Sequence, residues 1–162
     1  MSKLDETDIS ILRILQTDSN LTTKELAERV NLSTTPVFER LKRLENEGYI
    51  KRYIAILDAD KLHCGFTVFC QIKLKQVNKQ IAQEFTAAIN AMPEVAECYN
   101  TSGEFDYLLK IKVTDMEAYR KFIMERLGTV DSLASLQSIF VMDETKYIYG
   151  LNLGGSTPPS RT

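Results

Sequence analysis

The residues best suited to chemistry are basic side chains in the first third of the sequence. Between positions 40 and 52 the chain carries five basic residues and two acidic ones, a local excess of three positive charges. The basic residues are Arg40, Lys42, Arg43, Lys51 and Arg52. Lys and Arg neutralise phosphates, and Arg also bonds the edge of guanine. Because the whole chain has a net charge of −2, any affinity for nucleic acid must come from this segment.

A single predicted helix would carry most of these residues. It is capped by Ser33, accepts Pro36 in its first turn and ends near Asn46, where Gly48 follows. At about 100° per residue, Val37, Leu41 and Leu44 fall on one buried side, and the opposite side would face a DNA major groove. The predicted DNA-contacting residues, including two basic residues beyond the helix, are Ser33, Thr34, Thr35, Phe38, Glu39, Lys42, Arg43, Lys51 and Arg52.

A charged helix face can equally be a solvated surface, so the interpretation depends on the neighbouring elements. Glu39 also needs an explanation, because a carboxylate repels phosphate unless it accepts from cytosine or orients an arginine. The sequence does not decide between these two roles.

Two shorter helices are predicted before this one. Asp5 can cap the first, which would run to Gln16. Thr22 and Glu25 have the spacing of a capping box for the second, which would end near Asn31. The predicted buried side chains are Ile9, Leu12 and Leu15 in the first helix and Leu26, Ala27 and Val30 in the second.

The segment 49–57 is rich in Tyr and Ile and is predicted to be extended. A strand pair here would carry Lys51 and Arg52. Capped helices joined by a tight link and followed by such a strand pair are typical of a winged helix-turn-helix, which favours DNA contact over a solvated face.

The second half of the sequence alternates between the periods of strands and helices. Strands are predicted from Phe66 to Leu74, at 95–101, at 105–113 and from Leu133 to Met142. Helices are predicted at 81–92 and after a capping box at Thr114–Glu117. This order, strand-helix-strand twice over, predicts a split βαβ arrangement with both helices on one face of an antiparallel sheet.

Several classes of site and location are disfavoured. The three cysteines, Cys64, Cys70 and Cys98, accompany no signal peptide, which predicts reduced thiols in a cytoplasmic protein. The only histidine, His63, has no second ligand at a useful spacing apart from Cys64, so no metal site is expected. No apolar run approaches the roughly 20 residues of a membrane helix. Without a phosphate-binding glycine loop or a GxSxG motif, no catalytic residue is predicted.

The sequence resembles the Lrp/AsnC, or feast/famine, family of transcription regulators over roughly residues 3 to 148. In the first half the resemblance lies in Leu4-Asp5, Ile11-Leu12, Leu26-Ala27, Leu32-Ser33, Arg40-Leu41, Arg43-Leu44-Glu45 and Gly48-Tyr49-Ile50. In the second half it lies in Gly103-Glu104-Phe105-Asp106-Tyr107-Leu108-Leu109, and between the two in Tyr53, Leu57-Asp58, Leu62 and Gly65.

This resemblance implies a small amino acid as effector, bound in crevices between dimers, and no further cofactor. It implies a homodimer that forms through its sheets and assembles to a tetramer or octamer. It also implies the effector-binding residues, which are Thr101, Ser102, Gly103, Glu104, Phe105, Asp106, Leu136, Gln137 and Ser138. Gly103 could instead serve only the hairpin turn, and Asp106 could only satisfy a neighbouring backbone group.

The predicted fold class is therefore α+β, with a winged helix-turn-helix at residues 1–53 and a β hinge at 54–65. A βαββαβ ferredoxin-like sandwich follows at 66–149, and a disordered tail at 150–162. The predicted function is regulation of transcription on double-stranded DNA in response to an amino acid. Two alternatives are an amino-acid-sensing regulatory subunit of a metabolic enzyme and an architectural DNA-binding protein without an effector.

Overall fold

The computed structural model describes residues 3–154 of the chain and consists of two compact units. The first, which we call the helical unit, contains the residues up to Ile56 together with those from Thr145 onward. The second, the sheet unit, contains Leu57–Glu144. The chain therefore passes between the two units twice, and the helical unit is built from both ends of the sequence.

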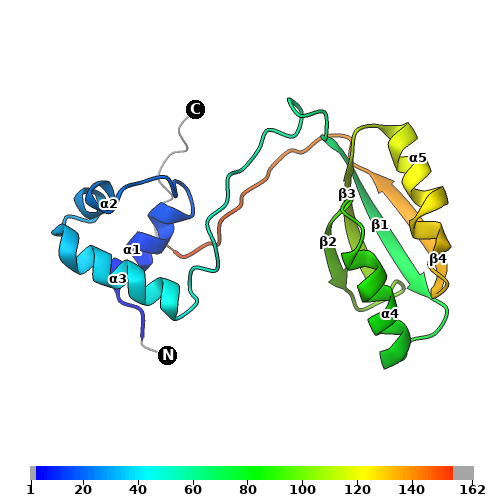
Figure 1. The fold of residues 1–162 in the computed structure, drawn as a ribbon, viewed down its shortest axis with the longest axis horizontal. Helices are drawn as coiled ribbons and strands as arrows, with labels where there is room; N and C mark the ends of the chain where they lie inside the picture. The colour runs from blue at the N-terminus through cyan, green and yellow to red at the C-terminus, as the bar shows by residue number, and fades with distance from the viewer. Residues whose placement is uncertain (1–2, 155–162) are drawn as a thin grey trace. The chain divides into compact units, whose positions relative to one another are not determined.

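Among its described residues the helical unit contains three helices, labelled α1, α2 and α3 in Figure 1: Glu6–Leu15, Thr23–Arg29 and Thr34–Asn46. Thr22 and Glu25 form the predicted capping box at α2, and Asp5 and Asp8 form another at α1. Ser33 is the N-cap of α3, as predicted, but its side chain makes no capping hydrogen bond. A positive φ of 78° at Gly48 follows the end of α3.

The core of the helical unit differs from the prediction in α1. The buried residues there are Asp8, Ile11 and Leu15, whereas Ile9 and Leu12 are half-buried. The stripe is rotated because Asp8, although charged, turns inward toward α3. The buried apolar side chains in the described part of the unit are Ile11, Leu15, Leu26, Ala27, Val37 and Leu44.

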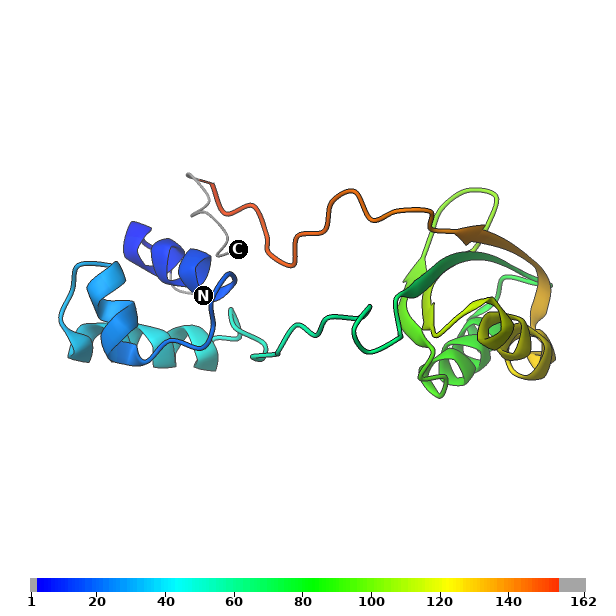
Figure 2. The same ribbon diagram turned by 90° about the horizontal axis from the view of Figure 1, so that it is seen from above.

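The sheet unit has the predicted order βαββαβ. Its strands are β1 (Phe66–Leu74), β2 (Val95–Asn100), β3 (Tyr107–Val113) and β4 (Leu133–Phe140), and its helices are α4 (Lys79–Asn90), α5 (Met116–Glu125) and the short η1 (Leu127–Thr129). The strands lie in the order β2-β3-β1-β4, and every neighbouring pair is antiparallel. Figure 2 shows α4 and α5 on the same face of this sheet.

Alternation along the strands separates the two faces of the sheet. In β1, Val68, Cys70 and Ile72 are fully buried under the helices, so Phe69 and Gln71 point to the other, open face. The cap of α5 is Asp115, which accepts from the Ala118 amide, rather than the predicted box beginning at Thr114. Asp115 is preferred because its carboxylate reaches the amide three residues on.

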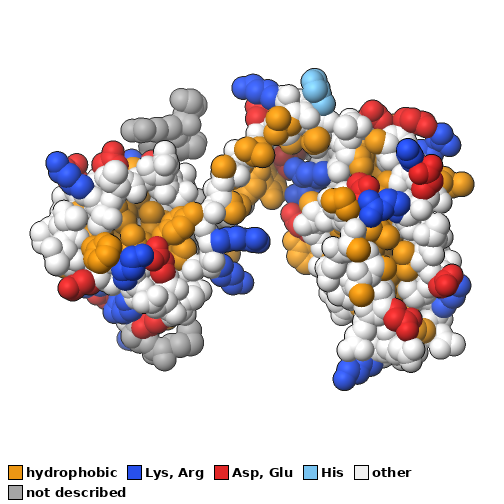
Figure 3. All heavy atoms as spheres, in the orientation of Figure 1, with side chains coloured by type: hydrophobic (Ala, Val, Ile, Leu, Met, Phe, Trp, Pro, Cys, Tyr) orange, Lys and Arg blue, Asp and Glu red, His pale blue; other side chains and the backbone are white. Residues whose placement is uncertain are grey.

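The predicted strand pair carrying Lys51 and Arg52 is not formed in the single chain. Residues 49–65 contain no strand, because a strand requires a hydrogen-bonded neighbour and none of the described strands pairs with this segment. Hydrophobic side chains along it remain exposed, as Figure 3 shows for the connection between the units. Among them are Ile54, Ile56 and Leu57, which are 55% to 67% exposed.

Part of the predicted disordered tail has partners in α1. Gln16, the C-cap of α1, forms two hydrogen bonds of 2.9 Å with the backbone of Leu151, one as donor and one as acceptor. Arg13 donates to the carbonyl of Leu153 at 3.4 Å. Residues 155–162 of that predicted tail lie outside the described residues.

Candidate DNA-contacting helix and ligand pocket

Three of the predicted DNA-contacting residues form the exposed beginning of α3. Ser33, Thr34 and Thr35 are all exposed, at the end where the backbone amides have no partner within the helix. Such amides and hydroxyls can donate to phosphate oxygens. One turn further on, Phe38 is 49% exposed and Glu39 is also exposed.

The basic side chains of α3 are mostly engaged by carboxylates of the same unit. Arg40 donates to Asp5 at 2.6 Å and to Asp8 at 2.8 Å, and Arg43 donates to the other oxygen of Asp8. The Asp8 side chain is only 1% exposed. Two guanidiniums of α3 thus neutralise one buried carboxylate of α1, a pairing that fixes the orientation of the helix.

These ion pairs alter the pKa values of the groups involved. A hydrogen bond from the Asp8 amide, with the Arg40 guanidinium second, lowers the pKa of Asp5. The carboxylates of Asp5 and Asp8 raise the pKa of Arg40. Arg40 therefore stays charged. The positive charges of Arg40 and Arg43 are partly compensated inside the unit, and Arg43 is less available to DNA than the sequence suggested.

Lys42 retains a more exposed position. Its ammonium contacts Glu45 at 2.8 Å and lies 5.9 Å from the ring centroid of Phe38. Glu45 also accepts from the hydroxyl of Tyr53 at 3.0 Å, which ties the segment after Gly48 to α3. Burial, and then the neighbouring Glu45, raises the pKa of Tyr53 to about 12. Lys51 and Arg52, just before this tyrosine, are exposed.

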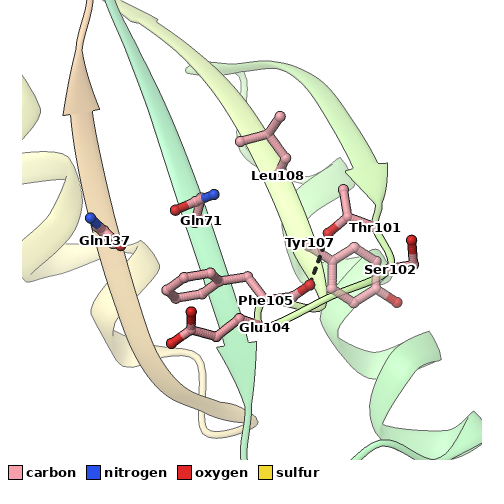
Figure 4. A pocket seen from close by; sticks show the side chains of 8 residues that line it. All are labelled: Gln71, Thr101, Ser102, Glu104, Phe105, Tyr107, Leu108 and Gln137. Carbon is pink, nitrogen blue, oxygen red and sulfur yellow. Dashed lines mark hydrogen bonds between the residues drawn. The ribbon is translucent and has the colours of Figure 1, made fainter.

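The sheet unit contains a pocket of about 410 Å³ beside the loop that joins β2 to β3. Its lining residues are Gln71, Thr101, Ser102, Glu104, Phe105, Tyr107, Leu108 and Gln137, drawn in Figure 4. Thr101, Ser102, Glu104, Phe105 and Gln137 were among the predicted effector-binding residues. Gln71 and Gln137 are direct cross-strand partners on β1 and β4.

Hydrogen bonds fix the loop at one end of the pocket. The Thr101 hydroxyl donates to the Phe105 carbonyl at 2.9 Å, the dashed line in Figure 4, and the Thr101 amide donates to the Asp106 carbonyl at 2.9 Å. Gly103, at the tip, has a φ of +129°, a conformation that side chains rarely adopt. These contacts hold the polar groups of the loop in place.

Asp106 has a structural role in this loop. Its carboxylate accepts from the Leu74 amide at 2.8 Å and lies 3.6 Å from the Lys73 ammonium, at the irregularity where the pairing of β1 with β4 shifts register. It does not line the pocket, and neither does Gly103. These contacts favour the simpler interpretation of both residues, in which they shape the loop.

The side chains of Leu136 and Ser138, which were also predicted to bind the effector, lie away from this pocket. Leu136 packs against the core, and Ser138 shares a hydrogen bond of 2.6 Å with the Tyr119 hydroxyl of α5. Both therefore point to the helix-covered face. Because side chains alternate along a strand, Gln137, which lies between them, faces the open side. The same alternation in β1 could have identified Gln71, which the sequence prediction missed together with Tyr107 and Leu108.

Within the described residues there is no cluster of His, Cys, Asp or Glu able to hold a metal ion. In that same part of the chain, no helix is long and apolar enough to cross a membrane.

Comparison with known proteins gives a consistent result in both units. Residues 4–51 match the family model for winged helix-turn-helix DNA-binding, and residues 67–151 match the model for the Lrp/AsnC ligand binding domain. The leucine-responsive regulatory protein of Salmonella typhimurium is 41% identical, over 88% of this chain and 87% of its own length. The DNA-binding transcriptional activator DecR of Escherichia coli is 38% identical, over 91% and 97%.

Solved structures agree with these sequence matches. A transcriptional regulator of Neisseria meningitidis, crystallised as a complex with L-Met, superposes with a TM-score of 0.89 at 38% identity and covers 92% of this chain and 96% of its own. An AsnC family transcriptional regulator from Agrobacterium tumefaciens superposes with a TM-score of 0.87 at 37% identity, covering 91% and 96%.

Proposed function

The chain belongs to the Lrp/AsnC family of DNA-binding transcription regulators, and from this premise we propose that it changes its affinity for DNA when an amino acid occupies the pocket beside the β2-β3 loop. The single observation that carries the proposal is this pocket. It occurs in a chain whose helical unit exposes the first turns of α3. The function requires the protein to work in the compartment that holds the DNA, which for a bacterial or archaeal regulator is the cytoplasm.

The chemistry of the pocket suits an amino acid with an apolar side chain. Thr101, Ser102 and the two glutamines offer donors and acceptors for the ammonium and carboxylate of the ligand. Phe105 and Leu108 offer apolar surface in the same cavity. The structure of the Neisseria relative with L-Met supports an effector of this kind.

A second copy of the chain would complete the regulator. The open face of the sheet carries two cross-strand pairs that include apolar side chains, Phe69 with Ile139 and Tyr99 with Leu108. Ile139 and Tyr99 are 44% and 52% exposed. A homodimer that pairs these faces would cover them and place two copies of α3 in one assembly, which suits paired half-sites on DNA. Further association to a tetramer or octamer would extend this assembly.

Calorimetric titration with the twenty amino acids, followed by DNA binding with and without the best ligand, tests the proposal. We expect one or a few apolar amino acids to bind the parent protein and Gln137→Ala to weaken that binding. The matched control is Gln80→Ala, an exposed glutamine on α4 remote from the pocket lining. If no amino acid binds while DNA binding persists, the protein is an architectural DNA-binding protein instead. If no DNA from the source genome binds, an enzyme's regulatory subunit becomes the better interpretation.

A further inference from the structure

Phe38 and Glu39 are adjacent residues on the exposed side of α3 and take no part in its ion pairs. Arg40 and Arg43 are drawn toward Asp8, and Lys42 is held by Glu45. Glu39, in contrast, makes no hydrogen bond or ion pair with any described residue. The Phe38 side chain is 49% exposed, although other side chains of α3 are buried in the core of the helical unit.

This arrangement removes one of the two roles that the sequence left open for Glu39. An acidic residue on a DNA-contacting helix can orient an arginine for the bases, but the arginines on α3 are paired with Asp5 and Asp8. The remaining favourable partner is a base amino group. Adenine places the acceptor N7 beside its amino group, which repels a carboxylate, whereas cytosine places a C–H there. A cytosine amino group is therefore the group that Glu39 fits.

Phe38 fits a second feature of the major groove. The C5 methyl of thymine is the apolar group that base pairs present there, and a phenyl ring can cover it. The Lys42 ammonium near the Phe38 ring would stay within reach of a phosphate. Because residues 38 and 39 are adjacent on the helix, about 100° apart, they can reach neighbouring base pairs in one half-site.

We propose that Phe38 and Glu39 determine the sequence preference of this protein, Phe38 by covering a thymine methyl and Glu39 by accepting a hydrogen bond from a cytosine amino group. The inference rests on the proposed function, since it requires α3 to enter the major groove. It adds which bases the helix selects.

Selection of binding sites from a randomised DNA duplex tests the proposal, with the full-length parent, Glu39→Gln and Phe38→Ala. Glutamine bonds adenine through its N6 and N7. We therefore expect Glu39→Gln to change one selected position from cytosine to adenine in each half-site. Phe38→Ala is expected to lose the preference for thymine at a neighbouring position. Both positions are exposed, so circular dichroism should show folded variants.

Two measurements separate base contact from simple charge or surface effects. Replacing the selected thymine by deoxyuridine removes only the methyl group and should weaken the parent about fourfold, the contribution of one buried methyl group. The same replacement should leave Phe38→Ala unchanged. The charge-matched control is Glu6→Gln, an exposed glutamate of α1, which should keep the parent's selected sequence.

The outcomes distinguish the inference from the function beneath it. If the parent selects no sequence, the inference fails together with the proposed DNA contact by α3. If the parent selects a site and both variants select the same one, α3 contacts DNA but these two residues do not choose the bases. If Glu39→Gln binds all sequences more tightly by one common factor, Glu39 only repels phosphate and its assigned role is overturned.

Discussion

The two units of this protein are held together in different ways. The sheet unit buries fourteen apolar side chains between one sheet face and its helices, whereas the described part of the helical unit buries six. The smaller core is supplemented by a buried carboxylate with two guanidiniums and by hydrogen bonds from the C-terminal segment to α1. The sheet unit thus depends on apolar burial, and the helical unit depends in addition on polar contacts between distant parts of the chain.

The two candidate sites also differ in their surroundings. The side of α3 that is proposed to contact DNA belongs to a helix held in place by Asp8. The pocket in the sheet unit opens on a sheet face that still exposes apolar side chains. If the protein dimerises as proposed, a second copy of the chain would cover the sheet face around the pocket.

The largest expected effect is the loss of a core ring in the sheet unit. Phe85→Ala removes a fully buried side chain that stacks on Tyr107 at a ring-centroid distance of 4.7 Å. The free energy of unfolding of the sheet unit should fall by about 3–5 kcal/mol. Hydrogen exchange should show faster exchange across the sheet unit and little change in α1 to α3. Val77→Ala, at an exposed site, is the control, and equal acceleration in both units would contradict the comparison.

Asp8→Ala should have the next largest effect, confined to the helical unit. It leaves Arg40 and Arg43 without their shared carboxylate, and since both guanidinium side chains are partly exposed we expect a loss of about 2–3 kcal/mol. DNA affinity should fall as well, because α3 loses its attachment to α1. Asp58→Ala breaks an exposed pair with Lys61 and should change stability by less than about 1 kcal/mol. Similar results for both variants would show that the buried pair contributes no more than a surface one.

A smaller loss is expected from Gln16→Ala, which removes both hydrogen bonds to Leu151. We expect the free energy of unfolding of the helical unit to fall by about 1 kcal/mol. Limited proteolysis should then cut residues 145–153 sooner. Gln80→Ala, which removes an exposed hydrogen bond to Glu84 within α4, is the control. Unchanged proteolysis would mean that the C-terminal segment does not support the helical unit.

The smallest expected effect is a loss of stability of the sheet unit at alkaline pH. Burial raises the pKa of Tyr119 from 10.0 to about 12 and that of Cys70 from 9.0 to about 11. The unfolded chain loses these protons first, so their contribution to stability is complete below pH 9 and declines as pH rises toward 12. Tyr119→Phe should flatten this decline in the sheet unit, measured by urea unfolding at several pH values. An unaltered slope in the variant would exclude Tyr119 as its cause.

The organisation of the fold could be predicted because it depends on local patterns. The box at Thr22 and Glu25, the period-2 alternation in β1 and the helical period from Ile81 to Met92 each report the conformation of a short segment. The same alternation, applied strictly, would also have separated Gln137 from Leu136 and Ser138. The predicted site had instead taken three consecutive residues together.

The sequence by itself determined the order of the elements, the family and the helix that carries the candidate DNA contacts. Only the tertiary structure decided that Asp8 is buried with Arg40 and Arg43, that Asp106 fastens the loop to the end of β1, and that the C-terminal segment packs on α1. The physical reason is that these contacts join residues at least 32 positions apart. Periodicity describes which side of its own element a residue occupies. Whether a carboxylate on that side meets water or two guanidiniums depends on the packing of another element against it.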